Sequence, residues 1–308
     1  MFEAAAIPWA CFCALLLACL ATWSTLLWRR RRFGHPLIAL EPRRPVPWGL
    51  VHLLAALLLM YLFERGAQSL INTTQPVLPA LRPRDLLAGA GARLAMVFAS
   101  LLVIVSGTRA SALDFGLQRA ALLGDLRLGL RTFLMFGPPA YAIQLVLTQW
   151  IPGTHPILES LRTAPDARLL AASVVSAVVV APVQEEFLWR VLFQGWLEKL
   201  DLSTKSSVSD GGSCDTTELW VGSRSGSREA RHPPGSVPHW PILFSSSLFA
   251  LLHFNHGPAA AALFVFAVGL GWTYQRTHRI LPCVIAHLLL NACSLALLFL
   301  ETGLDSGP

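Results

Sequence analysis

The sequence predicts an all-α protein, a polytopic membrane bundle of about eight transmembrane helices. Charged residues make up 14% of the 308 residues, whereas a soluble globular chain carries about 25%. Hydrophobic residues make up 54%. They gather in runs close to the roughly 20 apolar residues that a helix needs to cross a hydrocarbon core. This composition excludes a water-soluble globule, a disordered chain and a disulfide-rich secreted domain.

Eight apolar segments are candidate spans. They cover residues 4–28, 46–63, 90–106, 128–149, 169–197, 240–257, 259–275 and 280–300. The third and the seventh are near the shortest length that spans, so seven or nine spans are the alternatives. The first segment is predicted to be a retained anchor, because no positive charge precedes it and Arg29–Arg32 follow it.

The basic residues favour an orientation with both termini outside the cell. If the connection after the first span is cytoplasmic, most of the loop lysines and arginines lie inside. The outer loops then hold only five, which are Arg65, Arg82, Arg84, Arg162 and Arg168. Positive charge is retained on the cytoplasmic side. We therefore expect a multi-pass protein of the cell membrane with residues 201–239 in the cytoplasm.

Residues 201–239 interrupt the apolar pattern. They are rich in serine and glycine and carry charges of both signs. Such a segment buries too little apolar surface to offset its ordering entropy. We expect a flexible cytoplasmic loop, with a small regulatory or substrate-docking element as the alternative.

The net charge of +6 does not predict a nucleic-acid partner. The basic residues form short clusters beside apolar runs rather than along a polar face, as in proteins oriented by the bilayer. The six cysteines form no CxxC pair, which disfavours a zinc knuckle or a disulfide framework. The lipid bilayer is the expected partner, and nucleic acid is excluded.

The fifth span holds two carboxylates and a guanidinium among apolar neighbours. Ionisable residues inside a bilayer are costly, so each is a functional hypothesis. Glu186 and Arg190 are four residues apart and share one helix face, where they can neutralise each other. Glu185 lies about 100° around the helix, has no partner within it, and is a candidate general base. The alternative is that all three groups lie in the headgroup region at a helix end.

Two later spans add further polar residues. His253 lies in the sixth span, and His287 and Asn291 lie four apart on one face of the eighth. At 1.5 Å per residue, Glu185, His253 and His287 lie roughly 18, 20 and 10 Å from the inner helix ends. We expect them to meet in one cavity that opens to the cytoplasm. A base for water and donors for an oxyanion are what peptide hydrolysis requires.

Three short motifs in this order carry a family resemblance. They are Glu185-Glu186-x-x-x-Arg190, Phe249-x-x-x-His253 and His287-x-x-x-Asn291, and residues 268–277 before the last motif are also similar. Together they resemble the CAAX prenyl protease and bacteriocin-processing (CPBP, or ABI) family of intramembrane endopeptidases. The resemblance covers about residues 170–295.

The resemblance implies a function and a set of roles. Glu185 would activate the water, assisted by His253, and His287 and Asn291 would hold the oxyanion, while the ion pair of the first motif supports the site. A peptide or protein substrate would reach the site from the membrane or the cytoplasm. It also implies a catalytic core at 166–300, preceded by a variable transmembrane scaffold at 1–165 and followed by a short tail at 301–308.

The sequence departs from the family pattern at two places. Val191 stands where the family usually has a glycine after the arginine, and His278-Arg279 replace the usual Gly-Ser before the last helix. Neither change removes a proposed catalytic group.

Other proteolytic signatures are absent from the sequence. It contains no HExxH for a zinc protease and no Gly-x-Ser-Gly for a rhomboid-like one. The pair Gly269-Leu270-Gly271 is followed by Trp272 rather than by the aspartate of a presenilin-like site.

Two other functions and one cofactor question stay open at this stage. A transporter or channel with an intramembrane Glu/His proton relay would predict internal repeats, which the sequence lacks. A non-catalytic membrane partner protein is the other alternative. Glu185, His253 and His287 are also a possible ligand set for zinc or another divalent metal. The same groups can work without metal, which is the form we expect.

Overall fold

The computed structural model describes residues 2–41, 45–71, 81–118, 121–151, 153, 156–163, 166–201 and 238–305. Within these ranges the protein is helical and contains no strand, which confirms the predicted all-α class. Residues 202–237 of the predicted loop and 306–308 of the predicted tail lie outside the described residues.

The helices follow the predicted order of apolar segments. They are α1 (Phe2–Phe33), α2 (Leu50–Ile71), α3 (Pro83–Thr108), α4 (Leu122–Leu147), the short α5 (Pro156–Thr163), α9 (Trp240–Leu252), α10 (Ala259–Thr277) and α11 (Ile280–Asp305). A continuous helical segment, Ala167–Asp201, lies between α5 and α9. It comprises α6 (Ala167–Ser173), η2 (Val174–Val180), α7 (Ala181–Glu186) and η3 (Phe187–Gln194), and its last turns continue to Asp201.

Five of these helices are long and apolar enough to cross a membrane, by length and composition. They are Pro8–Phe33, Leu50–Ile71, Pro83–Thr108, Ala167–Asp201 and Ile280–Leu300. Each of the eight predicted segments overlaps one of these helical segments, so the chain is a multi-pass helical membrane protein.

The sixth segment is shorter than predicted. Helix α9 ends at Leu252, and His253 leaves the helical region with φ −97° and ψ 9°. A 3₁₀ turn at Phe254–His256 follows, and Gly257 then adopts φ 65° before Pro258 begins the next helix. A left-handed glycine followed by proline cannot continue a helix. The break places His253 at a helix end rather than inside a span.

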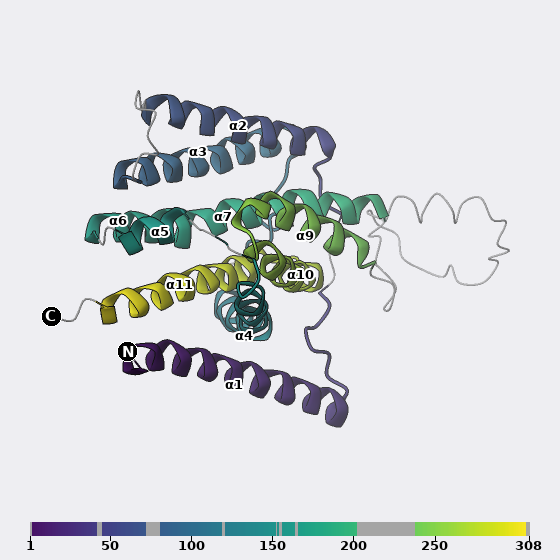
Figure 1. The fold of residues 1–308 in the computed structure, drawn as a ribbon. Helices are drawn as coiled ribbons and strands as arrows, with labels where there is room; N and C mark the ends of the chain where they lie inside the picture. The colour runs from purple at the N-terminus through teal and green to yellow at the C-terminus, as the bar shows by residue number, and fades with distance from the viewer. Residues whose placement is uncertain are drawn as a thin grey trace.

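The helices pack in layers around the segment Ala167–Asp201 (Figure 1). Helices α2 and α3 lie side by side on one face of this segment, and α10 and α11 lie on the other. Helix α4 packs against both α10 and α11, and α1 covers α4 on the outside. Both chain termini lie at the same end of the bundle, as Figure 1 shows.

Helices α4 and α10 approach closely through a small residue. A Cβ atom built on Gly269 would lie 2.3 Å from the ring of Phe136, so only glycine fits there. Small residues allow such close approach between helices in membranes. Thr132 and Thr273 share a hydrogen bond of 3.1 Å across the same contact. Helix α4, predicted to be scaffold, is therefore packed directly against the helices that carry the motifs.

A charged cluster joins α4 to the turn between α10 and α11. Arg279 pairs with Asp125 at 2.5 Å and with Glu41 at 2.8 Å. The Arg276 guanidinium donates to the carbonyl oxygen of Ile38. Burial raises the pKa of Glu41, while the charge of Arg279 opposes that shift. The cluster fixes the connection after α1 at the end of the bundle opposite the termini.

Candidate active site

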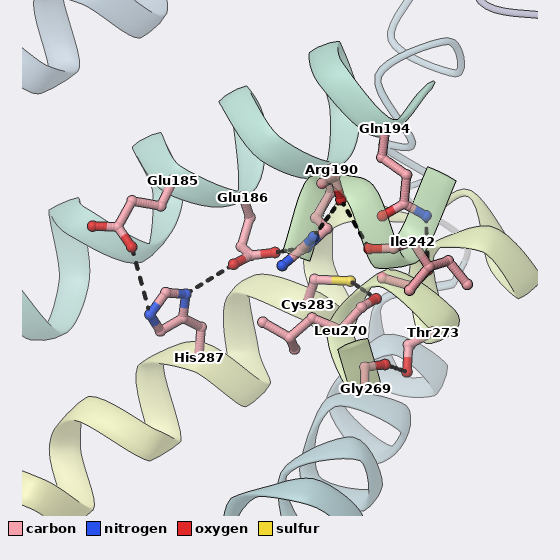
Figure 2. Close-up of polar contacts among 12 residues, drawn as sticks. Glu185, Glu186, Arg190, Gln194, Ile242, Gly269, Leu270, Thr273, Cys283 and His287 are labelled. Atoms are coloured by element: carbon pink, nitrogen blue, oxygen red, sulfur yellow. Dashed lines mark hydrogen bonds and ion pairs between the residues drawn. The ribbon is translucent and has the colours of Figure 1, made fainter. Parts of the chain in front are cut away.

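The two adjacent glutamates end a short α-helix between two π-helical segments. Helix α7 ends at Glu186, η2 precedes it and η3 follows it. π-Helical turns are uncommon and occur frequently at functional sites. Figure 2 shows that Glu185 and Glu186 both extend toward the imidazole of His287 on α11.

Glu186 is fully buried and holds two partners at once. One carboxylate oxygen accepts a hydrogen bond from Arg190 Nε at 3.1 Å. The other lies 2.8 Å from His287 Nδ1. This confirms the predicted pairing of Glu186 with Arg190. The second contact also fixes the orientation of His287, because a carboxylate that accepts the Nδ1 proton leaves Nε2 directed into the site.

Arg190 is held from a third helix. Its Nη1 donates to Ser245 Oγ on α9 at 3.0 Å, and both side chains are buried. Its guanidinium also lies over the ring of Phe249, 5.9 Å from the centroid, within the range of a cation–π contact. The sequence prediction missed Ser245. The available signal was its position four residues before Phe249 of the second motif, on the same face of one helix.

Glu185 lies on the other side of His287. Its Oε2 is 3.7 Å from His287 Nε2, and its side chain is 20% exposed, against 0% for Glu186. The prediction that Glu185 has no partner within its own helix agrees with this arrangement, since its neighbour comes from α11. The two carboxylates therefore differ in environment: one is buried in an ion pair and the other is accessible.

His253 and Asn291 complete the set. His253 Nδ1 lies 2.8 Å from the carbonyl oxygen of Phe249, and its ring contacts the Phe249 ring with centroids 4.6 Å apart. Asn291 Nδ2 donates to the carbonyl oxygen of Ala177 on η2 at 2.8 Å. An amide nitrogen carries two protons, so this bond leaves the second N–H of Asn291 for another acceptor.

A cavity of about 780 Å³ brings four of the predicted residues together. Glu185, His253, His287 and Asn291 all line it. Glu186 and Arg190 are buried behind them and are not part of the lining. The remaining lining is mostly apolar, with a few polar side chains from α3, α4, α5, α6 and α11 and from the residue that follows α4. Cavities of this size are typical of ligand sites.

The cavity extends toward the end of the bundle where the chain termini lie. Its lining includes Pro8, Trp9 and Phe12 near the start of α1, Gln144 and Leu145 near the end of α4, and Leu295, Leu297 and Leu298 in the second half of α11. In Figure 1 the beginning of α1 and the end of α11 lie at that end. We expected outward termini and also a cavity open to the cytoplasm. In this fold the two expectations contradict each other, because the end of the segment Ala167–Asp201 and the start of α9, which flank the predicted cytoplasmic loop, lie at the opposite end of the bundle (Figure 1).

The three possible metal ligands, Glu185, His253 and His287, all line the cavity. Within the described part of the chain, no three His, Cys, Asp or Glu side chains are grouped to hold an ion. His287 Nδ1 is engaged with Glu186, and His253 Nδ1 faces a backbone oxygen.

Together, the fold and the site define a class: a multi-pass helical membrane protein with an acid–histidine cluster inside the bundle. Residues 167–293 match the model of the type II CAAX prenyl endopeptidase Rce1-like family. The match covers the part of the chain that carries the three motifs, and it confirms the resemblance seen in them. Comparisons with curated proteins and with solved structures gave no match.

The pair His278-Arg279, which departs from the family pattern, lies at the end of α10. His278 ends α10 in the left-handed region, with φ 51°. Glycine adopts this conformation without steric cost, which accounts for the usual residue there. Arg279, the next residue, makes the ion pairs with Asp125 and Glu41. Val191, at the other departure, is fully buried in the core.

Proposed function

We propose that the chain is an intramembrane endopeptidase that hydrolyses a peptide bond with a glutamate-activated water. The observation that carries the proposal is the shared cavity. Glu185, His253, His287 and Asn291 come from three separate helical segments and line one space. The Glu186–Arg190 pair is buried directly behind it.

Glu185 is the general base. A base must reach the proton it removes while remaining accessible to water. Glu185 meets this requirement, because its carboxylate lines the cavity and is partly exposed. Glu186 does not, because Arg190 and His287 occupy both of its oxygens. His253, on the same cavity wall, orients the water.

His287 and Asn291 stabilise the oxyanion. They lie one turn apart on α11 and both face the cavity. Asn291 supplies its second N–H, and His287 supplies Nε2 when that nitrogen carries a proton. Glu186 fixes the imidazole through Nδ1, so the donor is oriented before the substrate arrives.

The substrate is a peptide segment with apolar character. The cavity is lined mostly by leucine, alanine and aromatic residues, and it lies inside a membrane bundle. The name of the matched family refers to prenylated substrates with a C-terminal CAAX sequence, which suggests a lipid-modified peptide as the first candidate. Such a substrate would enter from the bilayer or from the aqueous phase.

The test uses membranes from cells that lack the protein. These are mixed with the purified wild-type chain or with Glu185→Gln in H₂¹⁸O, and the released peptides are identified by mass spectrometry. Hydrolysis predicts peptides with ¹⁸O in new carboxyl termini in the wild-type sample alone. If a folded wild-type protein releases none, while vesicles containing it conduct protons, the relay alternative replaces this proposal.

A further inference from the structure

A single arginine lies within α3, away from the catalytic helices. Arg93 is the only charged residue between Asp85 and Arg109. At 1.5 Å per residue it lies about 15 Å from the first residue of α3. A charged side chain this deep in a span costs about 2.5–3.5 kcal/mol on insertion scales, so its presence calls for a function.

Arg93 belongs to the inward face of α3. Ala90, Met96 and Ser100 are buried, and Arg93 lies three residues after the first and three before the second. At helical spacing these residues form one stripe, and helix α3 packs against α6 and η2 as well as α2. Arginines near helix ends commonly extend to the headgroups. Arg93 instead lines the interior cavity that also contains Glu185.

The guanidinium of Arg93 has hydrogen-bond donors that can bind an anion. No hydrogen bond or ion pair joins Arg93 to another residue in the described part of the chain. Glu159 of α5 also lines the cavity, but it is exposed and has contacts elsewhere. A guanidinium presents five donors in a fork that matches a carboxylate. It is therefore suited to an oxyanion supplied by a ligand.

The apolar residues that line the same cavity as Arg93 define the rest of that ligand. Leu81, Ile157, Leu295 and Leu298 line the cavity and belong to one hydrophobic cluster. An apolar wall with one cation fits an apolar chain that carries a single negative group. The carboxylate of Glu185 repels an anion, so the anionic end of a bound peptide is directed away from the site of hydrolysis.

We propose that Arg93 forms a subsite that binds a carboxylate of the peptide substrate, and so helps to set which peptides are accepted. The inference rests on the proposed function, because it assumes that the cavity takes a peptide. It adds a specificity residue on a helix outside residues 167–293, the part that matches the family model.

The test is a binding measurement, which does not depend on turnover. The full chain in phosphatidylcholine nanodiscs is titrated with a fluorescent peptide that ends in farnesyl-Cys-Val-Leu-Ala. The free acid is compared with the C-terminal amide. The wild-type protein should bind the acid about 10–100-fold more tightly, the ratio expected for a hydrogen-bonded charge. Arg93→Gln should reduce this ratio to about one by weakening the acid alone, and Arg93→Lys should retain part of it.

Arg131→Gln is the matched control. Arg131 is a half-buried arginine within α4 that does not line the cavity, so its replacement should leave the ratio unchanged. A wild-type ratio near one, no binding of either peptide, or an unchanged ratio in Arg93→Gln would each overturn the proposal. The titration is repeated in nanodiscs that also contain phosphatidylglycerol. If Arg93→Gln then weakens the binding of both peptides equally, and only in these nanodiscs, the proposal is also overturned, because Arg93 would bind the phosphate of an anionic lipid. Clear discrimination by a chain that hydrolyses nothing would uphold the subsite and refute only the proposed function.

Discussion

Replacing Glu186 with glutamine tests the buried ion pair behind the cavity. Glu186 and Arg190 are both 0% exposed and lie 3.1 Å apart. Glutamine keeps the shape of the side chain and one acceptor for His287 but removes the charge that neutralises Arg190. Removing one partner of a buried pair typically costs about 3–5 kcal/mol, because the other charge stays buried without compensation. We expect a loss of this size in the free energy of unfolding.

The measurement is SDS-driven unfolding of the purified protein in mixed micelles, followed by circular dichroism. Glu185→Gln is the matched control, since the same substitution one residue earlier affects a partly exposed carboxylate with no salt bridge to Arg190. It should cost less than about 1 kcal/mol, as expected for a site without a buried pair. The double variant Glu186→Gln/Arg190→Met removes the orphaned charge and should recover at least half of the loss.

Two results would refute this reasoning. One is a Glu186→Gln protein within about 0.5 kcal/mol of the wild type, which is the range of ordinary surface substitutions. The other is a double variant whose loss equals the sum of the two single losses, because residues in contact should couple. Either result would mean that the pair is hydrated or separated in the membrane.

Three further predictions concern helix contacts and topology. Ser245→Ala removes the partner of Arg190 Nη1 and should cost about 1–3 kcal/mol. Ser245→Ala should also lower kcat more than it raises KM. Ser246→Ala is the control, because it removes a buried hydroxyl that has no hydrogen-bond partner in the described chain. This control should change neither the free energy of unfolding nor the kinetics. Gly271→Ala places a Cβ 2.9 Å from Gln194 Oε1 and from Ile242, so unfolding assays should show a loss of about 1–3 kcal/mol; a neutral result would show that the helices separate freely. Cysteines are introduced at positions 210 and 305 of the chain, and sealed cells are treated with a reagent that does not cross the membrane. Only position 305 should be labelled, because lysines and arginines are retained on the cytoplasmic side and their distribution among the loops places both termini outside. Labelling at 210 alone would reverse the topology and turn the cavity toward the cytoplasm.

Much of the site was predictable from the sequence. Some of its contacts join residues close together on one helix, and others follow from how far along its helix each residue lies. The Glu186–Arg190 pair follows from a spacing of four residues on one helix. Counting residues from the helix ends placed His253 and His287 at compatible depths, and both line the cavity. The end of α9 was predictable in principle, because Gly257-Pro258 cannot continue a helix.

Other contacts depend on how the helices rotate against one another, which a single sequence does not specify. The hydrogen bond from Arg190 to Ser245 joins two helices across a long sequence separation. A serine in an apolar helix gives no sign of which neighbour it faces. Likewise, the pattern of α3 marked Arg93 only as a charge inside a span, and the cavity that it lines appears only in the folded bundle.

The rate of peptide hydrolysis by Glu185→Gln tests the central claim most directly. The substrate is a peptide that the wild-type protein releases in the ¹⁸O experiment, and both proteins are assayed in the same proteoliposomes. Glutamine cannot remove a proton from water, and general-base contributions are typically about 10²–10⁴-fold, so kcat should fall by at least about 100-fold in a normally folded protein. A Glu185→Gln protein with full activity would contradict the account, because the accessible carboxylate in the cavity would then not be the base.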